Sequence, residues 1–326
     1  MTRHSSGLKS NLKFWFIMLV AMVAAAAALF LSASHIRPPD AVKVSFAERS
    51  AIPPIQEISS LAYGQPSDSS LRVAIAGVLS PRSTLESYQE LLDYLGKKTG
   101  RQVTLFLKPT YAEVNELLKG QRVDIAFICS LAYVKGRQDF GLELLVVPQM
   151  RGDTVYYSYL IVHRGSMTTS LEELKASSFA FTDPLSNTGY LVPTYQLYLL
   201  NEVPGSFFSR YIFTYSHDNS IKAVSEKLVD AAAVDSLVYD HMATSNPEII
   251  SRTRVIARWG PYGIPPVVVS PALDPQLKLQ LQDSFLDIHS SDEGRRILGK
   301  SGIDKVVLAN DSIYNSVKEM QIKLGW

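Results

Sequence analysis

From position 71 onward, the chain alternates short apolar runs with stretches in which apolar residues recur at every third or fourth position. Runs of the first kind predict buried strands, and spacing of the second kind predicts helices with one face in a core. The predicted strands of the first half are residues 71–78, 103–107 and 123–128. Two predicted helices separate them. One runs from a capping box at residues 83–86 to Gly100, and the other from Thr110 to Gly120.

The second half repeats this alternation and therefore predicts a second, similar sheet. Its predicted strands are residues 179–182, 212–215 and 231–234, and its predicted helices begin at about Gly189 and cover about 220–228 and 236–244. The chain is thus expected to be an α/β protein with two lobes.

Two extended apolar segments, residues 156–163 and 266–270, are predicted to cross between the lobes and to form a hinge. The first lobe then consists of residues 71–160 plus 267–326, with C-terminal helices at about 274–289 and 312–320, and the second of residues 161–266. In open α/β sheets, ligands bind beyond the carboxyl ends of the strands. We therefore expect the loops that follow strands to line a cleft between the lobes.

The amino-terminal part carries an export signal. Residues 14–34 are uncharged and mostly apolar, and they follow three basic residues with no acid. A run of this length fits either a cleaved signal peptide or an uncleaved membrane anchor. Residues 35–70, rich in proline and then in serine, are predicted to form a tether, with a weak strand signal at 42–46. The folded part is therefore expected outside the cytoplasm, in the periplasm, either released by cleavage or anchored to the membrane through residues 14–34.

Charge and motif content exclude several function classes. Without the first 34 residues, 29 basic residues stand against 31 acidic ones, so binding of nucleic acid through bulk charge is not expected. The six histidines are scattered without metal-ligand spacing, and no motif of nucleophilic or metal-dependent catalysis is present. We expect no enzyme activity, no metal and no cofactor. Cys129 is the single cysteine, so no intramolecular disulfide can form.

The most informative loop lies between a predicted strand and a predicted helix. Ser186, Asn187 and Thr188 stand immediately before Gly189, and Pro193 requires that the helix start near this point. Free N–H groups at a helix start, with hydroxyl and amide donors beside them, suit a tetrahedral oxyanion. The alternative is ordinary N-capping by the serine or threonine.

At this loop the sequence resembles the phosphate-, phosphite- and phosphonate-binding proteins of ABC uptake systems. The family pattern D-P-x-S-x-[ST]-G-x-L-x-P is matched from Asp183 to Pro193. Further matches follow at Tyr111 and at residues 123–126, 156–158, 216–218 and 229–232, so the resemblance covers about residues 71–320. It implies the two-lobed type II periplasmic-binding-protein fold, a small oxyanion as ligand, a membrane ABC permease as partner and a monomeric carrier.

The resemblance also implies roles for single residues. Tyr111 and Tyr156 would supply phenol walls and hydrogen bonds, the turn from Ser186 to Gly189 would hold the oxyanion, and His217 would close from the second lobe. A histidine near its pKa can donate from both ring nitrogens. The alternatives are core aromatics for the two tyrosines and a helix cap for the histidine.

Two further residues follow predicted strands. Asp235 is expected at the cleft rim or as a helix cap. Leu237 and Pro265 stand where aminophosphonate-binding relatives would carry acids, which disfavours an amino-substituted ligand unless Asp235 replaces them. Cys129 is expected to be a buried, inert thiol. The alternative is a sensor in which its thiolate is a soft ligand for trivalent arsenic. This alternative comes from the resemblance, since arsenic-sensing relatives use a cysteine in the cleft and signal to a histidine kinase.

Overall fold

The computed structural model describes residues 70–77 and 81–326, and the side chains from residue 84 onward within its first helix. The predicted signal or anchor, the predicted tether and the weak strand at 42–46 lie outside the described residues. Within them, no helix is long and apolar enough to cross a membrane.

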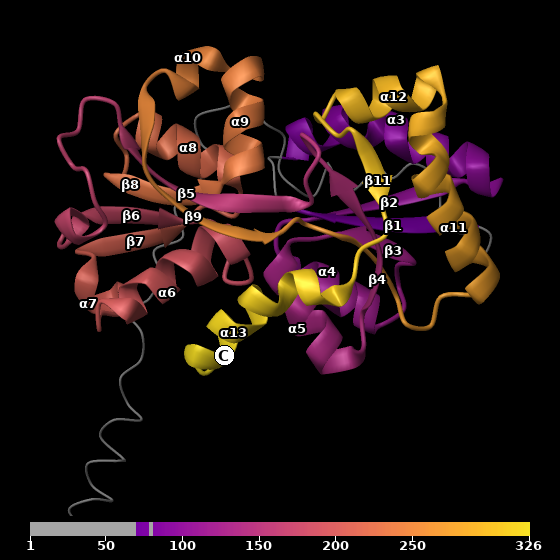
Figure 1. The fold of residues 1–326 in the computed structure, drawn as a ribbon, viewed down its shortest axis with the longest axis horizontal. Coiled ribbons are helices and arrows are strands. Elements are labelled where there is room, and N and C mark those ends of the chain that lie inside the picture. Colours follow the sequence, from indigo (N-terminus) through magenta and orange to yellow (C-terminus); the bar gives the residue numbers. More distant parts are fainter. Residues whose placement is uncertain (1–69, 78–80) are drawn as a thin grey trace, which may run out of the picture. The chain divides into compact units, whose positions relative to one another are not determined.

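The first lobe is built on a six-stranded mixed sheet (Figure 1). Its strand order is β11-β4-β10-β3-β1-β2, with β1 parallel to β2 and β3, and with β10 and β11 antiparallel to their neighbours. The strands are β1 (Leu71–Ala76), β2 (Val103–Lys108), β3 (Ile125–Phe127), β4 (Glu143–Gln149), β10 (Val267–Val269) and β11 (Lys305–Val307). The helices are α3 (Pro81–Thr99), α4 (Tyr111–Lys119), α5 (Ser130–Phe140), α11 (Pro275–Asp287), α12 (Asp292–Gly299) and α13 (Asn315–Lys323), with short turns η4 (Ile288–Ser290) and η5 (Asp311–Tyr314).

The second lobe is built on a five-stranded sheet with the order β7-β6-β8-β5-β9. Its strands are β5 (Val155–His163), β6 (Ser178–Phe181), β7 (Arg210–Phe213), β8 (Ala231–Asp235) and β9 (Thr253–Gly263). Its helices are α6 (Val192–Leu199), α7 (Pro204–Phe207), α8 (His217–Ser225), α9 (Ser236–Ser245) and α10 (Pro247–Ile250), with turns η2 (Glu172–Leu174) and η3 (Asn187–Leu191).

The two predicted crossovers are themselves strands of the sheets, which corrects their placement. β5 pairs with both β8 and β9 in the second sheet, and β10 pairs with β3 and β4 in the first. The chain passes between the sheets just before each of these strands, at residues 150–154 and 264–266. An apolar run of this kind pairs as a strand within one sheet. The sequence pattern therefore indicates the strand itself and not the short connection between the sheets that precedes it.

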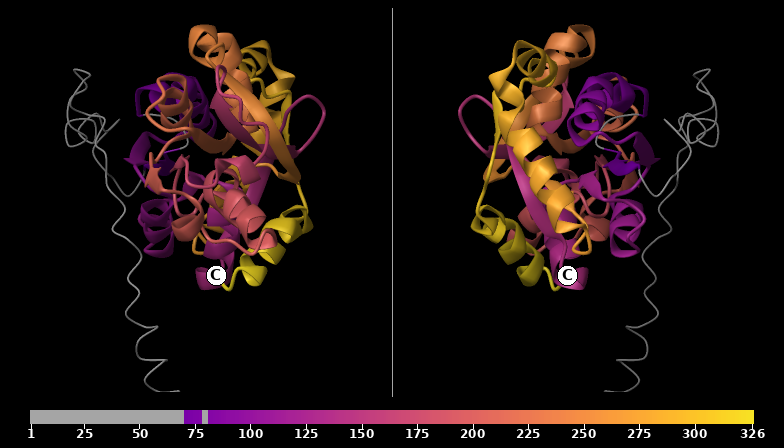
Figure 2. Two further views of the ribbon diagram at one scale, coloured as in Figure 1. Left: turned by 90° about the vertical axis from the view of Figure 1, so that its left-hand side faces the viewer. Right: turned by 90° about the vertical axis from the view of Figure 1, so that its right-hand side faces the viewer.

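Each sheet buries both faces, because helices cover it on either side (Figure 2). In β1, Leu71, Val73 and Ile75 enter one core with α3 and α11, whereas Ala74 and Ala76 enter the opposite core with α4 and α5. This alternation follows from the two-residue period of a strand. The core beside α4 and α5 also takes in Leu191 and Val192 of the second lobe, so the lobes share apolar packing.

Both ends of α4 and the end of α3 lie where the sequence predicted them. Thr110 caps α4 by accepting a hydrogen bond from the backbone N–H of Glu113, and Gly120 ends that helix. Gly100 ends α3 with a φ of 64°, which favours glycine. α3 begins at Pro81, two residues before the predicted capping box. The strands β4, β9 and β11 and the helices α5 and α12 were not among the predicted elements.

Candidate oxyanion-binding site between the lobes

Tyr111 joins the two lobes at the start of α4. It is 2% exposed, and its backbone N–H donates to Asp183 Oδ2 at 3.2 Å. Asp183 follows β6 of the second sheet, and its Oδ1 accepts from the N–H of Leu185 at 2.7 Å. Burial raises the pKa of Asp183 to about 6, while these two backbone donors lower it. Loops that follow strands of both sheets therefore meet, as the predicted cleft requires.

The turn at Ser186 starts helical structure two residues earlier than predicted. Ser186 Oγ accepts from the N–H of Gly189 at 3.0 Å, so the capping alternative is correct for this side chain. Residues Asn187–Leu191 form a single wide π-helical turn, η3, and α6 begins after it with Pro193 in its first turn. A Cβ on Gly189 would lie 1.9 Å from Thr182 Oγ1. Only glycine fits there.

Tyr156, in β5, is fully buried and lies against this turn. Its hydroxyl oxygen accepts a hydrogen bond from Asn187 Nδ2 at 3.0 Å and lies 3.1 Å from Ser130 Oγ. Ser130 has one hydroxyl hydrogen, which it donates to the carbonyl oxygen of Gly263 at 2.6 Å, so the hydrogen of Tyr156 can go to Ser130 Oγ or to a ligand. Thr188 contributes its backbone here, since its carbonyl accepts from Ser158 Oγ at 2.6 Å.

Several polar atoms in this cluster are buried without a hydrogen-bond partner among the described residues. They are Tyr111 Oη, Thr182 Oγ1 and Asn187 Oδ1. Buried polar groups normally have a partner, because an unpaired one loses its hydrogen bonds to water. Three such atoms on neighbouring elements leave this cluster with unused hydrogen-bonding capacity.

His217 is the first residue of α8 and is 2% exposed. Its Nδ1 accepts a hydrogen bond from the backbone N–H of Asp235 at 3.0 Å, so the proton of the neutral ring is on Nε2. Burial lowers its pKa to about 4, against a smaller opposing effect of Asp218. The expectation that both nitrogens donate is therefore wrong, because a backbone donor occupies one of them. The cap of α8 is Ser216.

Asp235 ends β8 and caps α9, so the cap alternative applies to it, yet it also lies among the phenols of the site. Its Oδ1 accepts from the N–H of Leu237 at 2.7 Å. Burial raises its pKa to about 7. Its charge in turn raises the pKa of Tyr88, Tyr111 and Tyr156, for each of which burial is the larger cause.

Cys129 directly precedes α5 and is 4% exposed. Its Sγ donates to the carbonyl oxygen of Leu185, in the second lobe, at 2.9 Å. Burial raises its pKa to about 12, partly offset by backbone donors from Ala132 and Asn187. At neutral pH it is therefore a thiol, located beside Tyr111 and Tyr156, whose pKa values its charge would raise.

All nine predicted ligand-binding residues thus lie at or next to one buried interface between the lobes. Asp183, Ser130 and Tyr88 belong to the same cluster but were not predicted as site residues. Asp183 lies two residues and Ser130 three residues after the end of a strand, a signal that could have singled them out. Tyr88 sits inside a helix, and only tertiary packing brings it near Asp235.

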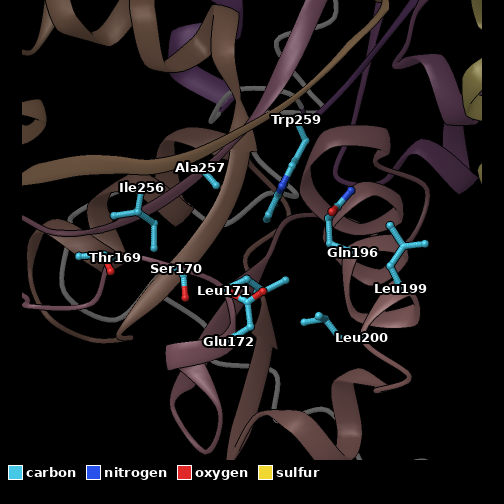
Figure 3. A pocket seen from close by; sticks show the side chains of 10 residues that line it. All are labelled: Thr169, Ser170, Leu171, Glu172, Gln196, Leu199, Leu200, Ile256, Ala257 and Trp259. Atoms are coloured by element: carbon cyan, nitrogen blue, oxygen red, sulfur yellow. The ribbon is translucent and has the colours of Figure 1, made fainter.

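A metal site and a separate cavity are two other kinds of site that the described part of the chain could offer. The described residues contain no group of three or more histidine, cysteine or acidic side chains arranged to hold a metal ion. A cavity of about 220 Å³ lies elsewhere in the second lobe (Figure 3). It is bounded by α6, by β9 and by the residues that lead into η2. Trp259, Gln196 and Leu199 line it, and no predicted site residue does, so the chemistry described above lies outside it.

Comparison with known proteins decides the family. The family described as "ABC transporter, phosphonate, periplasmic substrate-binding protein" matches residues 73–314. The chain belongs to this family. The family predicted from the sequence is therefore confirmed, and the chain has the general function of a transporter's substrate-binding protein. Such proteins work outside the cytoplasm with a membrane permease.

Individual relatives agree with this assignment. The phosphonates-binding periplasmic protein of Escherichia coli is 27% identical over 255 residues, which cover 76% of this chain and 75% of that protein. A phosphonate-transporter binding protein from Pseudomonas aeruginosa is 25% identical, with a TM-score of 0.75 over 80% of this chain and 87% of that one. A Prochlorococcus marinus protein in complex with methylphosphonate is 19% identical, with a TM-score of 0.72 over 79% and 98%. The predicted type II periplasmic-binding-protein fold is confirmed.

Proposed function

We propose that this phosphonate-family protein captures a small anion with a tetrahedral phosphorus centre, of the alkylphosphonate, phosphite or phosphate type, and delivers it to an ABC permease. The observation that carries the proposal is the convergence of the Tyr111 and Tyr156 hydroxyls with the turn η3 in one buried cluster. These groups come from both lobes, so closure of the lobes would surround the ligand.

The hydrogen-bonding character of the cluster supports an anion. Burial raises the pKa of Tyr111 and of Tyr156 well above 10, so both keep their protons and can donate. His217 donates from Nε2 for the reason given above. Among the described side chains, the causes of the pKa shifts of these groups, and of Asp183 and Asp235, include no lysine or arginine. The described part of the cluster would therefore hold its ligand by directed donors.

The carboxyl groups bear on which anion is preferred. With a pKa of about 7, Asp235 is half protonated at neutral pH and can share a proton with a ligand oxygen. Leu237 and Pro265, where acids would meet an ammonium group, carry none. We therefore place methylphosphonate, phosphite and phosphate ahead of 2-aminoethylphosphonate.

The position of Cys129 keeps a sensor as the second candidate. Its sulfur lies in the same interface as the two phenols, where a trivalent arsenic species could reach it. In that case the protein would signal to a histidine kinase instead of feeding a permease. The raised thiol pKa argues against this candidate, because a soft metal ion or metalloid binds the thiolate.

Calorimetric titration of the purified full chain, in mild detergent because of the apolar run 14–34, tests both candidates. The probes are methylphosphonate, phosphite, phosphate, 2-aminoethylphosphonate, sulfate and arsenite, each against wild type and Cys129→Ser. Binding of a phosphorus anion that survives Cys129→Ser supports the transport proposal. Binding of arsenite alone, lost in Cys129→Ser, would establish the sensor. Sedimentation of the ligand complex tests the proposed monomer, and the mass of the exported protein shows whether residues 1–34 are removed.

A further inference from the structure

The last part of the chain, residues 311–326, touches both lobes and is called here the bridging segment. It is rooted on the first lobe. Asp311 accepts a hydrogen bond from the Tyr133 hydroxyl and forms an ion pair with Arg137 at 3.0 Å, both in α5. Gln321, 3% exposed, donates to Gln138 Oε1 at 3.4 Å. Figure 1 shows α13 lying between α5 and α6, and both views in Figure 2 place it beside α5.

The bridging segment also packs against the connection that returns from the second sheet to the first. The Tyr314 hydroxyl donates to the carbonyl oxygen of Ile264 at 2.9 Å. A Cβ on Gly263 would lie 2.6 Å from the carbonyl oxygen of Ile313, so the two backbones are in close contact. The segment is therefore fixed to the first lobe and to the joint between the lobes.

Its far end reaches the ligand-binding turn of the second lobe. The Trp326 ring stacks on Tyr190 with centroids 5.0 Å apart and an interplanar angle of 20°. Lys323 Nζ donates to the Tyr195 hydroxyl at 3.2 Å. Tyr190 belongs to η3, the turn that contains Asn187 and Thr188.

Tyr190 is held firmly on its other side. Its ring makes edge contacts with Phe181 at 5.0 Å and with Phe213 at 5.2 Å, both in strands of the second sheet. A contact on Tyr190 is therefore a contact with the second lobe as a whole. Since the bridging segment is fixed to the first lobe, the stack on Tyr190 exists only while the lobes are together.

We propose that Trp326 is a positioning residue for ligand binding: its stack on Tyr190 latches the lobes together and holds η3 against the ligand. This inference rests on the proposed function, because it concerns how the ligand is retained. An interaction present only in the closed form slows opening, and hence ligand release, without changing the encounter with ligand. Trp326 is 40% exposed, so its role in core packing is limited.

Release kinetics of the full chain, with methylphosphonate, phosphite or phosphate as the probe, test the latch. An aromatic pair of this kind corresponds to a roughly three- to ten-fold change in an equilibrium constant. Trp326→Ala should raise both the dissociation constant and the dissociation rate by that factor and leave the association rate unchanged. Trp326→Phe should restore most of the loss. The matched control is Ile322→Ala, in α13 of the same segment, 66% exposed and outside the stack, which should behave as wild type.

A wild-type dissociation rate in Trp326→Ala, or an equal change in Ile322→Ala, would overturn the latch. Hydrogen exchange of the amides of residues 187–191 without ligand provides a second readout that does not depend on the proposed function. The latch predicts faster exchange in Trp326→Ala than in wild type and in Ile322→Ala, and equal rates would also overturn it. If wild type binds no phosphorus anion while exchange responds as predicted, the proposed function fails and the latch stands.

Discussion

Replacement of Tyr111 by phenylalanine should separate ligand binding from folding. The Tyr111 hydroxyl is buried without a hydrogen-bond partner among the described residues, so removing it takes no hydrogen bond to any of them away. The unfolding free energy should stay the same or rise by up to about 1–3 kcal/mol, the cost of burying an unpaired polar group. If the hydroxyl donates to an anionic ligand, its loss removes roughly 1.5–3 kcal/mol of binding and weakens affinity about 10- to 150-fold.

The matched variant is Tyr156→Phe, because it removes the same atom from the neighbouring phenol. The Tyr156 oxygen accepts a hydrogen bond from Asn187, and without it the Asn187 amide donor is buried without a partner among the described residues. Folding should then lose about 1–3 kcal/mol, which lowers the melting temperature by roughly 2–10 °C for a chain of this size. Affinity should fall as well, so this variant loses both properties.

Scanning calorimetry without ligand and titration calorimetry with methylphosphonate, phosphite or phosphate measure the two effects separately. The reasoning is refuted if Tyr111→Phe melts as far below wild type as Tyr156→Phe does. It is also refuted if Tyr111→Phe binds like wild type, because the unpaired hydroxyl would then have no part in recognition.

Three further variants test single features of the site. Gly189→Ala should abolish ligand binding and lower the melting temperature by several degrees, because its Cβ would lie 1.9 Å from Thr182 Oγ1, whereas Gly205→Ala, with open space around it, should not. His217→Asn can keep an acceptor for the Asp235 N–H but loses the Nε2 donor, so titration should show an affinity at least about ten-fold weaker with a nearly normal melting curve. In wild type, Asp235 gains negative charge as pH rises through about 7, so anion affinity should fall from pH 6 to pH 8. Asp235→Asn keeps the helix cap and should fall less over that range, and parallel pH profiles would contradict the assignment.

The elements predicted from sequence were those whose signals are local. Thr110 and Gly120 bound α4 because a side-chain cap and a glycine end act within one turn. Strand β9 was missed because Gly260 and Pro261 place turn-like residues inside it, and an edge strand tolerates them. β4 was missed for a related reason, since Pro148 interrupts its apolar run.

The sequence predicted which residues lie together in the candidate cluster, but not the contacts between them. The motif around Ser186 placed the turn correctly, yet which groups of that turn face Tyr156 depends on packing between the lobes. The bond from the Tyr111 N–H to Asp183 joins residues 72 positions apart. The tautomer of His217, in α8, is set by the backbone N–H of Asp235 at the end of β8, and no local sequence pattern reveals this contact.

The protonation states of the buried ionisable side chains affect how a carrier releases its ligand. Burial shifts the pKa of Asp235 up and that of His217 down, and both shifts favour the neutral form. Asp183 keeps more of its charge and accepts hydrogen bonds from two backbone N–H groups. The described ionisable groups of the cluster thus add little attraction for an anion. Under the proposed function, binding depends on phenol, imidazole and backbone donors that act only at hydrogen-bond distance. Such donors lose their hold as soon as the lobes separate and water replaces the ligand.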